Sequence, residues 1–171
     1  MNIPADLRVG DILLYDEPDI VDDVIAIKTG DDVAHIEIYA GLGQSWASRN
    51  GIGVNQYPFR AHGLMYIRRP IQPIDIRAVL VWVKPYIGSP YGFGDILASV
   101  DIVTKWNGMD CSHFAACLLE AGGAPQFDLD CDKRKIAPRD FKIVLESSIM
   151  HPPPKVAQDD ASDPQSSVKS S

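Results

Sequence analysis

Cys111 is the residue of this chain whose type and position best suit covalent chemistry. It follows Asp110 at the start of a predicted helix over residues 111–121, and Asp is a favoured N-cap residue. A thiol attacks as its thiolate, and the dipole at a helix N-terminus stabilises that anion. The first backbone N–H groups of such a helix would also face a developing oxyanion. We therefore predict that Cys111 is a nucleophile, although most buried cysteines are simply small apolar residues.

A nucleophilic thiol needs a base, and the chain has four histidines. Three of them suit this role poorly. The side chain of His113 diverges from that of Cys111 on the same helix. His62 falls in a predicted loop, and His151 falls in a polar C-terminal segment. His35 remains, in an alternating apolar segment that also carries Glu37 on the face of the histidine. We predict His35 as the base, although a strand histidine is more often structural.

The other two cysteines have no assigned chemistry. Cys117 falls within the predicted helix of Cys111, where we expect it in the core, and Cys131 falls in a polar run, where we expect a surface thiol. Three cysteines without CxxC spacing indicate neither a disulfide framework nor a zinc site. We expect no metal and no cofactor.

Short strands should carry His35 and its neighbours. Alternation and turn residues predict them over residues 11–15, 34–40, 44–48, 54–57 and 64–68. Within the second strand, Ile36 and Ile38 share one face, and His35, Glu37 and Tyr39 share the other. That polar set is expected to face water or a cleft.

Helices should follow the strands along the chain. They are predicted over residues 73–86, 93–103 and 111–121, with a short earlier helix over 19–29 and a last helix or strand over 140–150. In the first of these, the apolar stripe consists of Ile76, Val79, Leu80 and Val83. The fold class is α+β, an antiparallel meander or half-barrel with helices gathered on it.

Length and composition set the outer limits. The chain has 171 residues, of which 46% are hydrophobic, and this predicts one domain over residues 1–150. Residues 151–171 are rich in Pro, Ser and Asp and should form a flexible tail. The net charge of −7 argues against nucleic acid as a partner. Without a signal peptide or a spanning apolar run, we expect a cytoplasmic protein, with release by lysis or export by another route left open.

Three segments resemble motifs of the NlpC-type papain-fold hydrolases: residues 8–13 (RVGDIL), 34–41 (AHIEIYAG) and 110–114 (DCSHF). The loop 88–92 (GSPYG) is similar to a loop of that family's circularly permuted branch. In most of that family the cysteine helix precedes the histidine strand, whereas here His35 precedes Cys111. This order is similar to that of the circularly permuted branch, which includes YiiX-like proteins and lecithin:retinol acyltransferase-like enzymes.

The resemblance implies a fold and a reaction. The fold would be a permuted papain-like domain with the nucleophile at a helix N-terminus. The Cys111 thiolate would attack an amide, ester or thioester carbonyl and form an acyl-enzyme, with His35 as base. The resemblance favours a peptidase or amidase acting on cell-wall peptides such as peptidoglycan fragments. Alternatives are an acyltransferase or lipid or thioester hydrolase, an isopeptidase for ubiquitin-like modifiers, and a binding module that has lost catalysis.

One position departs from the pattern of that branch. A Glu or His normally follows the strand histidine and orients its ring, but Ala47 occupies the corresponding place here. Glu37, Ser48 and Asn50 are alternative orienting groups, as a neutral third residue can serve in papain-like enzymes. The predicted catalytic residues are therefore Cys111, His35, Glu37 and Ser48. The predicted substrate-binding residues are Tyr91, Asp110, Ser112 and Asn50.

Overall fold

The computed structural model describes residues 3–16, 32–92, 108–127, 130 and 132–144. Its strands are β1 (Ile12–Tyr15), β2 (His35–Gly41), β3 (Gln44–Arg49), β4 (Gly53–Pro58) and β5 (Leu64–Arg68). Its α-helices are α2 (Ile76–Val83), α4 (Cys111–Ala121) and α5 (Pro138–Val144), and its 3₁₀ turns are η1 (Lys84–Tyr86) and η2 (Lys133–Lys135). The α+β class is confirmed. Some predictions concern segments outside the described residues: the helices over 19–29 and 93–103, the surface thiol of Cys131 and the tail over 151–171.

The five strands form one antiparallel sheet in the order β4-β3-β2-β1-β5. Strands β1 to β4 follow one another as the predicted meander. The fifth strand departs from it, because β5 pairs with β1, with Leu13 opposite Ile67, and not with β4. The short segment 59–63 therefore leads from one edge of the sheet to the other, with Phe59 fully buried. The predicted meander is therefore wrong for β5. This strand pairs with β1 at the other edge of the sheet, where Ile67 is buried.

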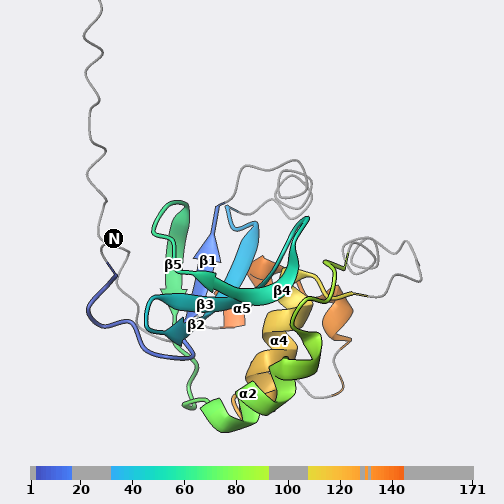
Figure 1. Ribbon diagram of the computed structural model, residues 1–171. Coiled ribbons are helices and arrows are strands. Elements are labelled where there is room, and N and C mark those ends of the chain that lie inside the picture. The colour runs from blue at the N-terminus through green and yellow to red at the C-terminus, as the bar shows by residue number, and fades with distance from the viewer. Residues whose placement is uncertain (1–2, 17–31, 93–107, 128–129, 131, 145–171) are drawn as a thin grey trace, which may run out of the picture.

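The two faces of the sheet have different partners. On one face, side chains from four strands join side chains of α2 and α4 in the main core; the buried members include Ile12, Leu14, Ile36, Ile38, Trp46, Val54, Val79, Phe114 and Leu118. Helix α4 packs against β2 and β3, and α2 packs against α4 (Figure 1). The opposite face holds a smaller apolar cluster of Leu13, Tyr15, Tyr39, Phe59 and Ile67. His35 and Glu37 belong to that second face by alternation, because Tyr15 pairs with His35 and Leu13 with Glu37.

Helix α4 matches its prediction at both ends. Asp110 caps it by accepting a hydrogen bond from the His113 backbone N–H at 2.7 Å, and the helix ends at Gly122. Phe114 and Leu118 are buried, as expected. Cys117 is only half-buried, so its predicted place in the core is wrong: it lies on the flank of the helix.

Helix α2 is shorter than predicted and buries a narrower stripe. Asp75 caps it, so the first helical residue is Ile76, and η1 continues it around Pro85. Val79 and Val83 are buried against the core, but Leu80 is 52% exposed. The prediction that Leu80 belongs to the buried stripe is wrong, because α2 packs mainly against α4 and buries a narrow row of side chains.

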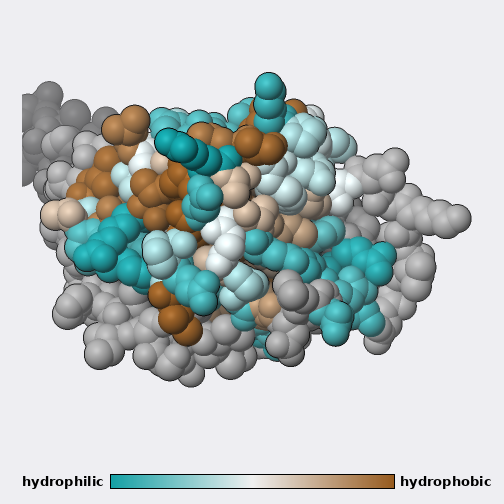
Figure 2. Space-filling model, turned by 90° about the horizontal axis from the view of Figure 1, so that it is seen from below, coloured by the Kyte–Doolittle hydropathy of each residue, from teal (hydrophilic) through white to brown (hydrophobic). Residues whose placement is uncertain are grey.

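Exposed apolar residues lie on and beside α2. Val81 is 78% exposed and Ile87 45%. Figure 2, which looks at the molecule from below, shows apolar side chains interspersed with hydrophilic ones on the face seen. Within the described ranges, no helix has the length and apolar character needed to cross a membrane.

Candidate active site

The site combines the first residue of a strand with the first residue of a helix. His35 begins β2, and Cys111 begins α4, which packs against that strand. Both side chains are buried, with exposed fractions of 2% for His35 and 1% for Cys111. They lie within hydrogen-bonding reach of each other. The structure thus brings together the two residues predicted as base and nucleophile.

The start of α4 sets the surroundings of the Cys111 thiol. The Asp110 carboxylate caps the helix through Oδ1, and its contact with substrate stays a prediction. The hydroxyl of Ser112 lies 3.9 Å from Cys111 Sγ. The dipole of α4 favours negative charge on a thiolate or an oxyanion at the N-terminus of the helix.

Glu37 is the residue that contacts the histidine ring from behind. The distance between His35 Nε2 and Glu37 Oε1 is 3.3 Å, although the two residues lie two positions apart on one strand. The Glu37 side chain is fully buried, so it does not line an open cleft. Its other oxygen, Oε2, accepts a hydrogen bond from the Ser45 hydroxyl. Glu37, one of the three alternative orienting groups, makes this contact with the ring.

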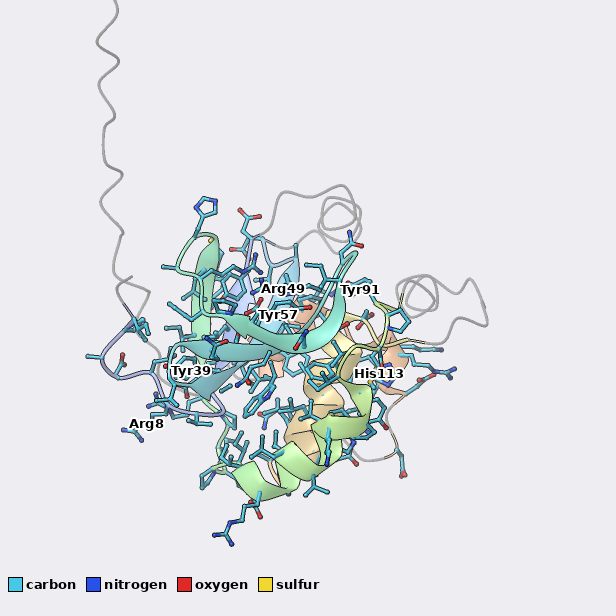
Figure 3. The ribbon with its side chains drawn as sticks, in the orientation of Figure 1. Arg8, Tyr39, Arg49, Tyr57, Tyr91 and His113 are labelled. Carbon is cyan, nitrogen blue, oxygen red and sulfur yellow. The ribbon has the colours of Figure 1, made fainter. Side chains whose placement is uncertain are left out.

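Two arginines converge on the same oxygen of Glu37. Arg49 places Nε at 2.9 Å and Nη2 at 2.7 Å from Oε1, and Arg60 places Nη2 at 3.2 Å from it. Arg49 lies over the Tyr57 ring, 4.1 Å from its centroid, and Figure 3 shows these two side chains next to each other on β3 and β4. Arg60 lies over Tyr15 in the same way, at 4.3 Å.

Charge within this cluster shifts two pKa values. Burial alone would raise the pKa of Glu37, but the hydrogen bond and charge of His35, the charge of Arg49 and the Ser45 hydroxyl hold it below its usual range. Burial alone would lower the pKa of His35. The charge of a Cys111 thiolate, a hydrogen bond to it, and the contact with Glu37 together raise that pKa to about 10. These interactions favour the protonated form of the His35 imidazole.

A glycine-containing loop places Tyr91 over the thiol. The Tyr91 hydroxyl lies 4.0 Å from Cys111 Sγ, and its side chain is buried. The loop is held to the edge of the sheet, because the Val54 N–H donates to Ser89 O at 2.9 Å. A side chain at Gly53 would not fit, since its Cβ would lie 2.0 Å from that carbonyl oxygen. Tyr91 thus lies beside the thiol of Cys111, and its contact with substrate stays a prediction.

Ser48 and Asn50 have other surroundings. Ser48 lies on the face of β3 opposite to Ser45 and Arg49, and its hydroxyl donates to the Met109 carbonyl at 2.6 Å. It thereby ties β3 to the segment before Cys111. Asn50 is half-buried in the turn after β3.

Ser45, Arg49 and Arg60 are functional candidates that are not among the predicted site residues. Tyr39 pairs with Ser45, so the alternate residues of β3 that include Ser45 and Arg49 share the face of Glu37. Strand alternation could have identified these two. Arg60 comes from the segment after β4, and its approach to Glu37 depends on how that segment crosses the sheet.

The described residues contain no group of three or more His, Cys, Asp or Glu side chains that could hold a metal ion. Comparison with models of protein families finds no match for this chain, and comparison with curated proteins finds none either.

Proposed function

We propose that this protein is a cysteine hydrolase in which Cys111 is the nucleophile, His35 the base and Glu37 the group that orients the histidine. The observation that carries the proposal is the chain of contacts from Cys111 to His35 and on to Glu37 Oε1, the last of them 3.3 Å long. A nucleophile, a base and an orienting acid in this sequence of contacts form the arrangement used in acyl transfer.

The reaction follows from the positions of these groups. Because His35 Nε2 faces Glu37, we assign exchange of the thiol proton to Nδ1. The Cys111 thiolate attacks the substrate carbonyl carbon, and the oxyanion forms near the Cys111 N–H and the Tyr91 hydroxyl. As the C–N or C–O bond breaks, His35 gives its proton to the leaving group. Water then attacks the thioester, His35 takes a proton from that water, and the free acid and the thiol are restored.

The protonation of His35 supports both halves of this cycle. An imidazolium next to the sulfur stabilises the thiolate, and the same proton is then available for the leaving group. Glu37 stabilises the imidazolium from the far side of the ring, as the aspartate does in serine-protease triads. Its charge is in turn compensated by Arg49 and Arg60.

The proposal extends to fold and substrate class through the motifs. A histidine strand that precedes a cysteine helix, a curved antiparallel sheet and a glycine-tyrosine loop at the nucleophile fit a circularly permuted papain-like domain. On that basis the substrate we propose is an amide bond of a cell-wall peptide. Turnover of thioesters without peptide cleavage would instead favour an acyltransferase or lipid hydrolase.

Substrate profiling of the purified protein tests this proposal. We expect release of amino-acid or peptide products from peptidoglycan fragments, or turnover of short-chain thioesters, together with an acyl adduct that mass spectrometry locates on Cys111. Cys111→Ala should abolish both, whereas Cys117→Ala, which changes a half-buried cysteine on the same helix, should retain them. Turnover that survives in Cys111→Ala, or an adduct on Cys117, would contradict the assignment.

A further inference from the structure

Arg49 is the most closely engaged partner of the Glu37 carboxylate. Two of its guanidinium nitrogens lie within 2.9 Å of Oε1, whereas Arg60 reaches the same oxygen with one nitrogen at 3.2 Å. The Arg49 side chain is 21% exposed and the Glu37 side chain fully buried, so the ion pair reaches from the surface into the interior. A planar guanidinium restricts the carboxylate more closely than a single ammonium group would.

The strand register explains how Arg49 reaches this place. Ile38 pairs with Trp46, and continuing that register puts Glu37 beside Ala47 and His35 beside Arg49. The methyl group of Ala47 leaves room across the strand for the Glu37 carboxylate. Arg49, at the end of β3, then extends over the histidine position to the same carboxylate.

We propose that Arg49 is a positioning residue: it holds the Glu37 carboxylate charged and fixed against His35, and so controls the imidazole that serves Cys111. This inference rests on the proposed function, because it assigns a role within the same reaction. Arg49 does not act on the substrate or on the sulfur. It acts through Glu37, whose Oε1 it shares with the histidine ring.

The reason that such a residue is needed is the burial of Glu37. A carboxylate without solvent tends to take up a proton, and a neutral acid would no longer stabilise an imidazolium. The titratable or charged side chains around the Glu37 and His35 pair are Tyr15 of β1, Arg49 of β3, Tyr57 of β4, Arg60 of segment 59–63 and Cys111 of α4. Among them the arginines supply the permanent positive charge, and Arg49 makes the closer contact.

Loss of Arg49 and loss of Arg60 should have different effects on Glu37. Arg60 lies over Tyr15, and the Tyr15 hydroxyl donates to the Arg60 carbonyl oxygen at 3.2 Å, so part of its role is to fix the segment after β4. Arg49 places both its Nε and its Nη2 next to the Glu37 carboxylate. Loss of Arg49 should therefore affect the charge of Glu37 more than loss of Arg60 does.

The experiment measures the titration of the Glu37 carboxyl carbon by NMR in the full chain. In Arg49→Gln we expect the midpoint to rise by about one pH unit or more, which is a tenfold change in proton affinity. Arg60→Gln should raise it less. Arg77→Gln, which removes an exposed arginine of α2, should leave it unchanged. Where turnover is measured, the acidic limb of the kcat/KM profile should move to higher pH in the same order.

Several outcomes decide the inference. An unchanged midpoint in Arg49→Gln, or an equal shift in Arg77→Gln, overturns it. Arg49→Lys keeps the charge but not the fork and should restore most of the wild-type midpoint, which loss of packing alone would not predict. If Arg49→Gln does not fold, Arg49→Lys carries the test, with a small upward shift expected and no shift contradicting the role. The expected midpoints in a protein that turns over no substrate would overturn the proposed function while supporting this charge arrangement.

Discussion

One buried carboxylate directly precedes β1 and another lies on the neighbouring strand β2, and the two have different roles. Asp11 precedes β1 and is 1% exposed, and Glu37 of β2 is fully buried. Each is paired with arginine: Arg69 holds both oxygens of Asp11 at 2.8 Å, and Arg49 holds Oε1 of Glu37. Burial and an arginine partner therefore do not distinguish a structural acid from a functional one.

The remaining partners of the two carboxylates make the distinction. Asp11 Oδ2 also accepts a hydrogen bond from the Arg8 backbone N–H at 2.8 Å, which closes the turn before β1. Glu37 instead contacts His35, a side chain whose charge can change during a reaction. An acid that holds backbone fixes geometry, whereas an acid that contacts an imidazole also sets a proton affinity.

The largest effect that follows from this comparison is expected for Glu37→Gln. The amide keeps the shape of the side chain but not its charge, so the imidazolium loses its support and the arginines lose their counter-ion. We expect the rate of substrate hydrolysis to fall by roughly 10²-fold or more, in the direction seen when the aspartate of a serine-protease triad is neutralised. Steady-state kinetics at neutral pH measures the change. Full activity in this variant would remove Glu37 from the mechanism.

A smaller and different effect is expected for Asp11→Asn. This change weakens the ion pair with Arg69 and the turn at Arg8, so it should lower the free energy of unfolding by about 1–3 kcal/mol. Urea denaturation measures that loss. Activity per folded molecule should stay at the wild-type level, because the Asp11 carboxylate contacts Arg69 and the Arg8 backbone N–H and not the histidine. If activity fell as far as in Glu37→Gln, the distinction between the two acids would be lost.

The finest test of the comparison is the pKa of His35 in the two variants. Loss of the Glu37 charge removes one of the interactions that raise the pKa of His35 to about 10, so Glu37→Gln should shift that pKa downward. Asp11→Asn should leave it unchanged. Imidazole NMR signals recorded as a function of pH measure both. Equal values in wild type and Glu37→Gln would show that Cys111 alone determines the charge of the histidine.

Local signals in the sequence were sufficient for most of the elements that hold the site. The alternation around His35 and the cap at Asp110 predicted β2 and α4, and α4 begins and ends at the expected residues. These predictions succeeded because strand alternation and helix capping depend on residues close together in the chain. The pairing of β5 with β1 was not predicted, because it depends on contacts between segments far apart.

The same division applies to the site. Residue types and order alone pointed to Cys111 and His35, since a helix N-terminus and an alternating strand are local features. They left the orienting group open among Glu37, Ser48 and Asn50. The register of β2 and β3 placed Ser48 on the other face and brought Arg49 to the Glu37 carboxylate. The path of segment 59–63 across the sheet brought Arg60 to it. A nucleophile and a base can be recognised from their own segments, but the charge that holds them ready depends on side chains that only folding brings together.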